Sequence, residues 1–216
     1  MVRQTRVLIT GFGRFPGAPS NPSGALAKAL ARRRRPALAG LALTAEVLPT
    51  TWEAAEGFAQ ALDREQPDIV LMIGLAGRRR QVCVETLAVN RAGGFPDALR
   101  RRPTSRRLDA SGPDAIGARA QAVSLVRALQ LTGVPARASR DAGRYICNAL
   151  AYGAYRHSRA TGRPRLAVFV HIPRPNRSRL ALPALLRALE ALLVALAGQF
   201  ASATRNEHPS RPHGRA

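Results

Sequence analysis

Short apolar runs alternate with helical patterns along most of the chain. Five apolar or β-branched runs predict strands, at residues 5–10, 41–48, 69–73, 136–139 and 166–170. Hydrophobic spacing and capping signals predict helices at residues 22–35, 51–66, 114–131, 147–159 and 182–200. The run at residues 69–73 is apolar throughout, as is typical of a strand covered on both faces. The pattern predicts an α/β fold.

Residues 81–90 also have the pattern of a strand, and period-two alternation would place Cys83, Glu85 and Leu87 on one face. A carboxylate among apolar side chains needs a partner if it is buried, and exposure of Glu85 at a sheet edge is the alternative. The Gly-, Pro- and Arg-rich residues 91–113 predict a long loop. Such a loop would cover a site or make a subunit contact.

The length of 216 residues predicts one domain, over residues 1–203, with a disordered basic tail at 204–216. The apolar run near the C-terminus carries Arg187 and Glu190, which argues against a membrane span. Two cysteines and an N-terminus without a signal-peptide pattern favour a reducing compartment. We therefore expect a cytoplasmic protein.

The formal net charge of +21 raises the possibility of nucleic-acid binding. Almost all basic residues are arginines, in scattered clusters at residues 32–35, 78–80, 100–102 and 106–107. Aromatic residues, which stack on bases in many nucleic-acid modules, make up only 5% of the chain. Nucleic-acid binding is therefore kept only as an alternative function.

A glycine-bearing turn at residues 141–148 delivers Cys147 to the predicted first turn of a helix. Backbone N–H groups and the helix dipole at such a position favour a thiolate, which lowers the pKa of a thiol. The alternative is that Cys147 is a small buried apolar residue. His171 follows a buried strand, so Cys147, His171 and Glu85 would supply a nucleophile, a general base and a group that orients the base. Cys83, Cys147 and His171 lack the spacing of a zinc site, and we expect no metal.

Four sequence blocks bear on the function. They are Val7–Phe15 with Gly17 and Asn21-Pro22-Ser23, Gly74–Arg78 through Glu85 and Asn90, Ala142–Asn148, and Val170–Pro173. In this order, and over nearly the whole chain, they resemble the type I pyroglutamyl (pyrrolidone-carboxylate) peptidase family of cysteine peptidases. The second, third and fourth blocks match the family's glutamate, cysteine and histidine.

The resemblance implies a three-layer α/β/α sandwich of the phosphorylase/hydrolase-like type, with a mostly parallel mixed central sheet. It implies a cysteine omega peptidase that cleaves after an N-terminal pyroglutamyl residue of a peptide. Cys147 would attack the carbonyl carbon to form a thioester, His171 would act as base and acid, and Glu85 would orient His171. No cofactor or metal is implied, and a homo-oligomer is possible.

The resemblance also implies substrate-binding residues. Phe12, Phe15, Tyr145 and Ile146 would wall a pocket for the lactam ring, with Asn21 and Asn90 as supporting polar groups and Leu75 at the rim. Without the resemblance, the two phenylalanines would be assigned to the core.

Three positions depart from the family pattern. Gly13-Arg14 stands where the family has Glu-Pro, Leu75 where it commonly has Gln, and Thr86 where it has Arg. These departures motivate a second hypothesis, that the chain is a divergent or inactive homologue with altered specificity for small acyl groups or lactams. The sequence suggests no role for Cys83.

Overall fold

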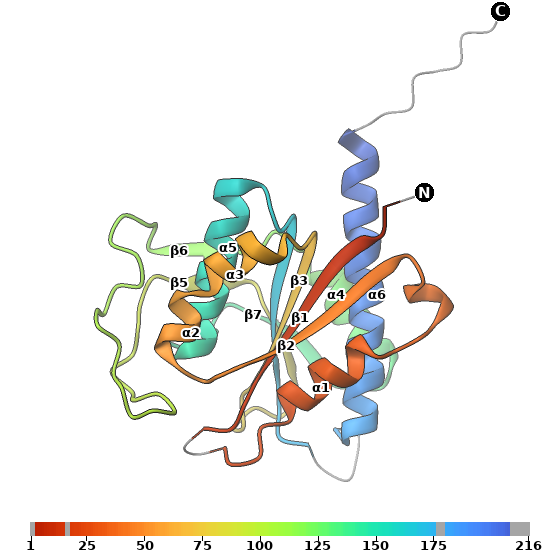
Figure 1. Ribbon diagram of the computed structural model, residues 1–216. Coiled ribbons are helices and arrows are strands. Elements are labelled where there is room, and N and C mark those ends of the chain that lie inside the picture. Colours follow the sequence, from red (N-terminus) through yellow and green to blue (C-terminus); the bar gives the residue numbers. More distant parts are fainter. Residues whose placement is uncertain (1–2, 16–17, 176–179, 208–216) are drawn as a thin grey trace, which may run out of the picture.

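The protein is a three-layer α/β/α sandwich around a six-stranded sheet (Figure 1). The computed structural model describes residues 3–15, 18–175 and 180–207. The sheet has the order β2-β1-β3-β8-β4-β7. Its strands are β1 (Thr5–Phe12), β2 (Leu41–Leu48), β3 (Ile69–Leu75), β4 (Val82–Glu85), β7 (Ala136–Ser139) and β8 (Leu166–Ile172). All neighbours are parallel except β4 and β8, which are antiparallel, so the mostly parallel mixed sheet is confirmed.

Helices cover both faces of the sheet and enclose two apolar cores. One core includes α1 (Pro22–Ala31), α4 (Ala122–Leu131) and α6 (Leu182–Glu207). The other includes α2 (Trp52–Glu56), α3 (Phe58–Glu65) and α5 (Ile146–Thr161), the helix that carries Cys147. A short 3₁₀ helix spans Pro36–Leu38, and a separate two-stranded sheet pairs β5 (Leu87–Val89) with β6 (Ala115–Gly117).

Helix α6 is the one described helix that is long and apolar enough to span a membrane by length and composition. Its apolar stripe is instead packed in the core: Leu185, Leu189, Leu192 and Leu196 are fully buried there. The helix continues to Glu207, so residues 204–207, which we expected to begin a disordered tail, are helical. The rest of the predicted tail lies outside the described residues.

Three other predicted elements are divided in the structure. The helix predicted at residues 51–66 is divided into α2 and α3 at Gly57. The Gly57 N–H donates to the Glu53 carbonyl at the end of α2. The strand predicted at residues 81–90 is divided at Thr86, where the pairing of β4 with β7 ends. Leu87 then pairs with β6, so it does not share a sheet face with Glu85 as predicted. The predicted helix at residues 114–131 begins with β6.

The long connection between β5 and β6 has neither helix nor strand over residues 90–114, as predicted (Figure 1). It is nevertheless well anchored. The buried Asp97 carboxylate accepts the N–H groups of Trp52, Leu99 and Arg101. The Tyr145 hydroxyl donates to the Pro96 carbonyl at 3.0 Å. These bonds fix the loop between the start of α2 and the start of α5.

Candidate active site

Glu85 and His171 form a buried hydrogen-bonded pair on the sheet face that α5 covers. His171 lies near the end of β8, and Glu85 ends the neighbouring antiparallel strand β4. The His171 Nδ1 and Glu85 Oε1 atoms are 2.8 Å apart, and Glu85 is 0% exposed. The alternative that Glu85 is exposed at a sheet edge is therefore wrong. Because a carboxylate only accepts hydrogen bonds, Nδ1 carries the proton and Nε2 is left as the basic nitrogen.

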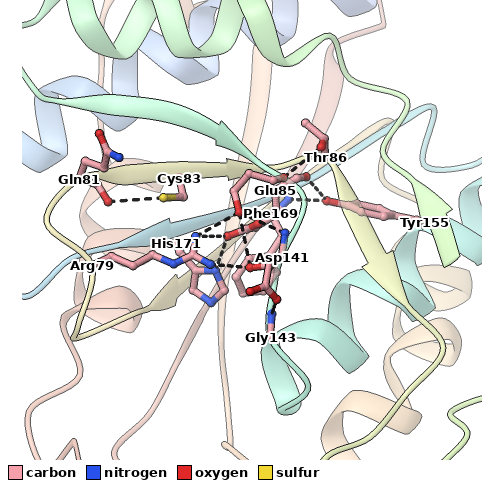
Figure 2. Close-up of polar contacts among 11 residues, drawn as sticks. Arg79, Gln81, Cys83, Glu85, Thr86, Asp141, Gly143, Tyr155, Phe169 and His171 are labelled. Carbon is pink, nitrogen blue, oxygen red and sulfur yellow. Dashed lines mark hydrogen bonds and ion pairs between the residues drawn. The ribbon is translucent and has the colours of Figure 1, made fainter.

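A second donor reaches the same carboxylate oxygen. Arg79 Nη1 lies 2.6 Å from Glu85 Oε1, and Arg79 Nη2 donates to the Asp141 carbonyl (Figure 2). The Tyr155 hydroxyl donates to the Glu85 carbonyl at 2.9 Å and accepts the Phe169 N–H at 3.0 Å. Hydrogen bonds thus hold both the backbone and the side chain of Glu85. The same Tyr155 hydroxyl also holds the β8 backbone at Phe169, two residues before His171.

Cys147 is brought to the same place by α5. It is the second residue of that helix, and its side chain is partly buried. A Cβ atom added at Gly74 would lie 3.1 Å from Cys147 Sγ and 2.6 Å from the Phe169 ring. Gly74 is the register partner of His171 in the β3–β8 pair. The absence of a side chain at Gly74 therefore lets the sulfur approach the sheet directly beside the histidine strand.

The turn that precedes α5 is shaped by its own side chains. The Gly143 N–H donates to Asp141 Oδ1 at 2.9 Å, and Gly143 has a φ of +80°, a conformation that favours glycine. Tyr145 stands at the N-cap position and makes no side-chain capping bond to any described residue. The first N–H groups of α5, around Cys147, therefore lack the side-chain acceptor that usually caps a helix start.

The pKa of the Cys147 thiol is raised to about 12, in the opposite direction from the helix-dipole prediction. Burial is the largest cause, and the Glu85 carboxylate adds to it. A hydrogen bond from the Cys147 N–H and the positive charge of Arg79 act in the other direction but do not compensate. The thiol is therefore protonated at neutral pH.

The predicted pocket aromatics are clustered near the start of α5. The rings of Phe15 and Tyr145 have centroids 6.3 Å apart, and Trp52 meets Tyr145 edge-on at 5.5 Å. Phe12 is 2% exposed and packs on Phe169, whose ring lies 4.8 Å from that of His171. Phe15 and Tyr145 thus remain candidate pocket walls, whereas Phe12 supports the His171 side from within the core.

The two predicted polar contacts, Asn21 and Asn90, are committed to the fold. Asn21 caps α1, accepting the N–H and hydroxyl of Ser23 and donating to the Gly13 carbonyl. Asn90 binds the backbone of Asp109 and Gly112 and so holds the long loop. Their amides therefore organise the surroundings of the site.

The last two predicted substrate-binding residues differ in exposure. Ile146 is 0% exposed and belongs to the core, so its side chain does not wall an open pocket. Leu75 ends β3 and is partly exposed, which leaves it available at a rim as predicted.

Sequence reasoning missed Arg79, Trp52 and Tyr155. Arg79 was one of three consecutive arginines, and nothing in the sequence distinguishes it from its exposed neighbours. Trp52 is the only tryptophan of the chain, and its indole N–H donates to the Phe95 carbonyl of the long loop. Within the described residues, no group of three or more His, Cys, Asp or Glu side chains is arranged to hold a metal ion.

Cys147 and the buried His171–Glu85 pair lie at one edge of an α/β/α sheet, and these are the side-chain types that a cysteine hydrolase uses. A family model described as pyroglutamyl peptidase matches residues 5–182, and the chain belongs to this family of cysteine peptidases. The pyrrolidone-carboxylate peptidase of Gloeobacter violaceus is 35% identical, over 88% of this chain and 96% of its own length. That of Streptomyces coelicolor is 37% identical, over 89% and 92% respectively.

The fold agrees with that assignment. The crystal structure of Bacillus amyloliquefaciens pyroglutamyl peptidase I is similar to this structure with a TM-score of 0.80 and 28% identity. The match covers 91% of this chain and 98% of the other. Family membership supports pyroglutamyl peptidase activity and gives no support to the nucleic-acid alternative.

Proposed function

We propose that the protein removes an N-terminal pyroglutamyl residue from peptides through a Cys147–His171–Glu85 triad. The observation that carries the proposal is the buried 2.8 Å contact between His171 and Glu85. Gly74, the register partner of His171 on β3, has no side chain, which leaves space for Cys147 Sγ next to the histidine. Relatives named pyrrolidone-carboxylate peptidase support the substrate class.

In the first half-reaction, His171 Nε2 takes the thiol proton as Cys147 Sγ attacks the pyroglutamyl carbonyl carbon. The S–C bond forms, and the carbonyl oxygen becomes an oxyanion within reach of the uncapped N–H groups at the start of α5. The C–N bond then breaks, and the proton passes from His171 to the leaving amine. The shortened peptide departs and leaves a thioester.

In the second half-reaction, water replaces the amine. His171 takes a proton from the water, the new C–O bond forms, and the S–C bond breaks. The proton returns to the sulfur, and pyroglutamate is released. Glu85 keeps Nδ1 protonated throughout, so that Nε2 alternates between base and acid.

The test is release of a fluorogenic amine from a pyroglutamyl amide. Cys147→Ala should abolish turnover, because it removes the nucleophile. Cys83→Ser is the comparison at the other cysteine: a serine hydroxyl can keep the contact with the Gln81 carbonyl, and because Cys83 also contacts Arg79 we expect reduced but measurable turnover. Activity that survives Cys147→Ala, or that is lost equally in both variants, would reject the assignment of the nucleophile.

An altered acyl specificity is the second candidate. It is favoured by the commitment of the Asn21 and Asn90 amides to backbone groups, and by Leu75 at the rim. A panel of pyroglutamyl, prolyl and acetyl amides decides between the two candidates. Preference for a substrate other than the pyroglutamyl amide, with the same loss in Cys147→Ala, would favour the altered specificity.

A further inference from the structure

Arg79 connects two parts of the site that lie far apart in sequence. It lies in the turn between β3 and β4, and its side chain is 22% exposed. One nitrogen contacts Glu85 Oε1 at 2.6 Å and Ser139 Oγ at 3.4 Å, while the other donates to the Asp141 carbonyl (Figure 2). Asp141 begins the turn that leads into α5 and Cys147.

We infer that Arg79 is a positioning residue of the triad, fixing the Glu85 carboxylate relative to the turn that carries Cys147. The inference rests on the proposed triad, and it assigns Arg79 no contact with the substrate. The planar guanidinium can hold both acceptors at once, which a lysine ammonium, as a single point charge, does less well.

The charge argument starts from the burial of Glu85. Its Oε1 atom takes the bonds from both His171 and Arg79, whereas its buried Oε2 atom has no hydrogen-bond partner among the described residues. A buried carboxylate with this little solvation is costly unless a cation is close. Arg79 is the cation in contact with it, and Glu85 in turn raises the pKa of Arg79 against the opposing effect of burial.

The other titratable groups facing the pair are His171 on β8 and groups on β4 and α5. Cys83, on β4, contacts Arg79. Cys147 and Tyr155, both on α5, face Glu85. Removing a positive charge makes every neighbouring acid hold its proton to higher pH. The positive charge of Arg79 acts in this way on Cys147, where it lowers the pKa of the thiol against the larger effect of burial. The base that takes the thiol proton in the proposed mechanism responds in the same way, so loss of Arg79 shifts the onset of activity to higher pH.

The test compares Arg79→Met and Arg79→Lys with Arg80→Met, a control at the exposed neighbour in the same turn. The pH dependence of kcat and KM is measured on a pyroglutamyl amide. For Arg79→Met we expect kcat to fall by about 100-fold, KM to change little, and the acid-side half-point to rise by about one pH unit or more. Arg79→Lys keeps the charge, so its half-point should stay near that of wild type while kcat falls by about tenfold. Arg80→Met should behave as wild type.

Two results would overturn the inference. One is an Arg79→Met enzyme with wild-type kcat, and the other is a fall in kcat with an unchanged half-point, which a purely structural role would give. If Arg79→Met does not fold, Arg79→Gln removes the charge while retaining a hydrogen-bond donor, and the same criteria apply to it.

A second measurement separates this inference from the proposed function. The His171 Nδ1 proton, bonded to a buried carboxylate, should give a far-downfield proton NMR resonance, assigned by its loss in His171→Gln. We expect the resonance to persist in Arg80→Met and to shift or vanish in Arg79→Met. If wild type shows no turnover, the proposed function fails, but an unchanged resonance in Arg79→Met would still refute the role of Arg79, and its loss would support it.

Discussion

The Tyr155 hydroxyl connects the two strands that carry the glutamate and the histidine. It donates to the Glu85 carbonyl on β4 and accepts the Phe169 N–H on β8. The Tyr155 side chain is fully buried, and burial raises the pKa of its phenol, so the hydroxyl stays protonated. Tyr155→Phe removes one oxygen atom and leaves the ring in place.

The cost of this change follows from the two groups that lose their partner. A buried polar group left without a hydrogen bond costs about 1–3 kcal/mol. Glu85 and Phe169 each lose a partner, so we expect Tyr155→Phe to lower the free energy of unfolding by about 2–6 kcal/mol. In a chain of this size, about 1 kcal/mol corresponds to a fall in Tm of roughly 2–4 °C.

Tyr152→Phe is the matched control on the same helix. Tyr152 is 2% exposed, as Tyr155 is, but its hydroxyl donates to the Pro113 carbonyl of the long loop and does not bridge two strands of the central sheet. Its removal should cost about 1 kcal/mol. Urea unfolding followed by circular dichroism measures both variants, and equal losses of stability would refute the bridging role of Tyr155. Because β4 and β8 carry the triad, kcat should also fall further in Tyr155→Phe.

The remaining predictions concern the thiol, the loop and the rim. Because burial raises the pKa of Cys147 to about 12, iodoacetamide at pH 7.5 should alkylate it more slowly in the folded protein than in urea. Peptide mapping distinguishes Cys147 from Cys83, and faster labelling of Cys147 in the folded protein would contradict the raised pKa. Asp97→Ala removes an acceptor of three N–H groups, so it should cost about 1–3 kcal/mol and speed proteolysis within residues 90–114; an unchanged cleavage rate would reject this anchor. Leu75→Gln should raise kcat/KM on the pyroglutamyl amide, and an unchanged or lower value would reject the rim role of Leu75.

The sequence predicted the layers of the fold because the local patterns and the packing agree. The fully apolar β3 is a central strand with helices on both faces, as its composition indicated. Glu85 and His171 were predicted from positions at strand ends and from the family resemblance, and the structure joins them by a hydrogen bond. The role of Cys147 as nucleophile stays a prediction until the variant is assayed.

Long-range hydrogen bonds account for what the sequence did not reveal. Thr86 donates to the Ser139 carbonyl, 53 residues further along the chain, where the pairing of β4 with β7 ends. The Asn148 amide binds the Val89 backbone and the Arg91 carbonyl, which docks the strand after this break onto α5. Local propensity contains no information on partners at such separations. A strand pattern at residues 81–90 therefore looked continuous.

The thiol pKa shows the same limit and also constrains the chemistry. The sequence places Cys147 at a helix start, where the local effect lowers the pKa of a thiol, but burial in the folded chain outweighs that effect. A thiol that stays protonated at neutral pH offers no preformed thiolate, so in the proposed mechanism proton transfer to His171 accompanies attack on the substrate. His171, the base in the proposed mechanism, then accepts a proton close to the positive charge of Arg79. Both side chains contact the same oxygen of Glu85. The Glu85 carboxylate makes this possible because its negative charge stabilises the imidazolium that forms. The positive charge of Arg79 alone would destabilise that imidazolium.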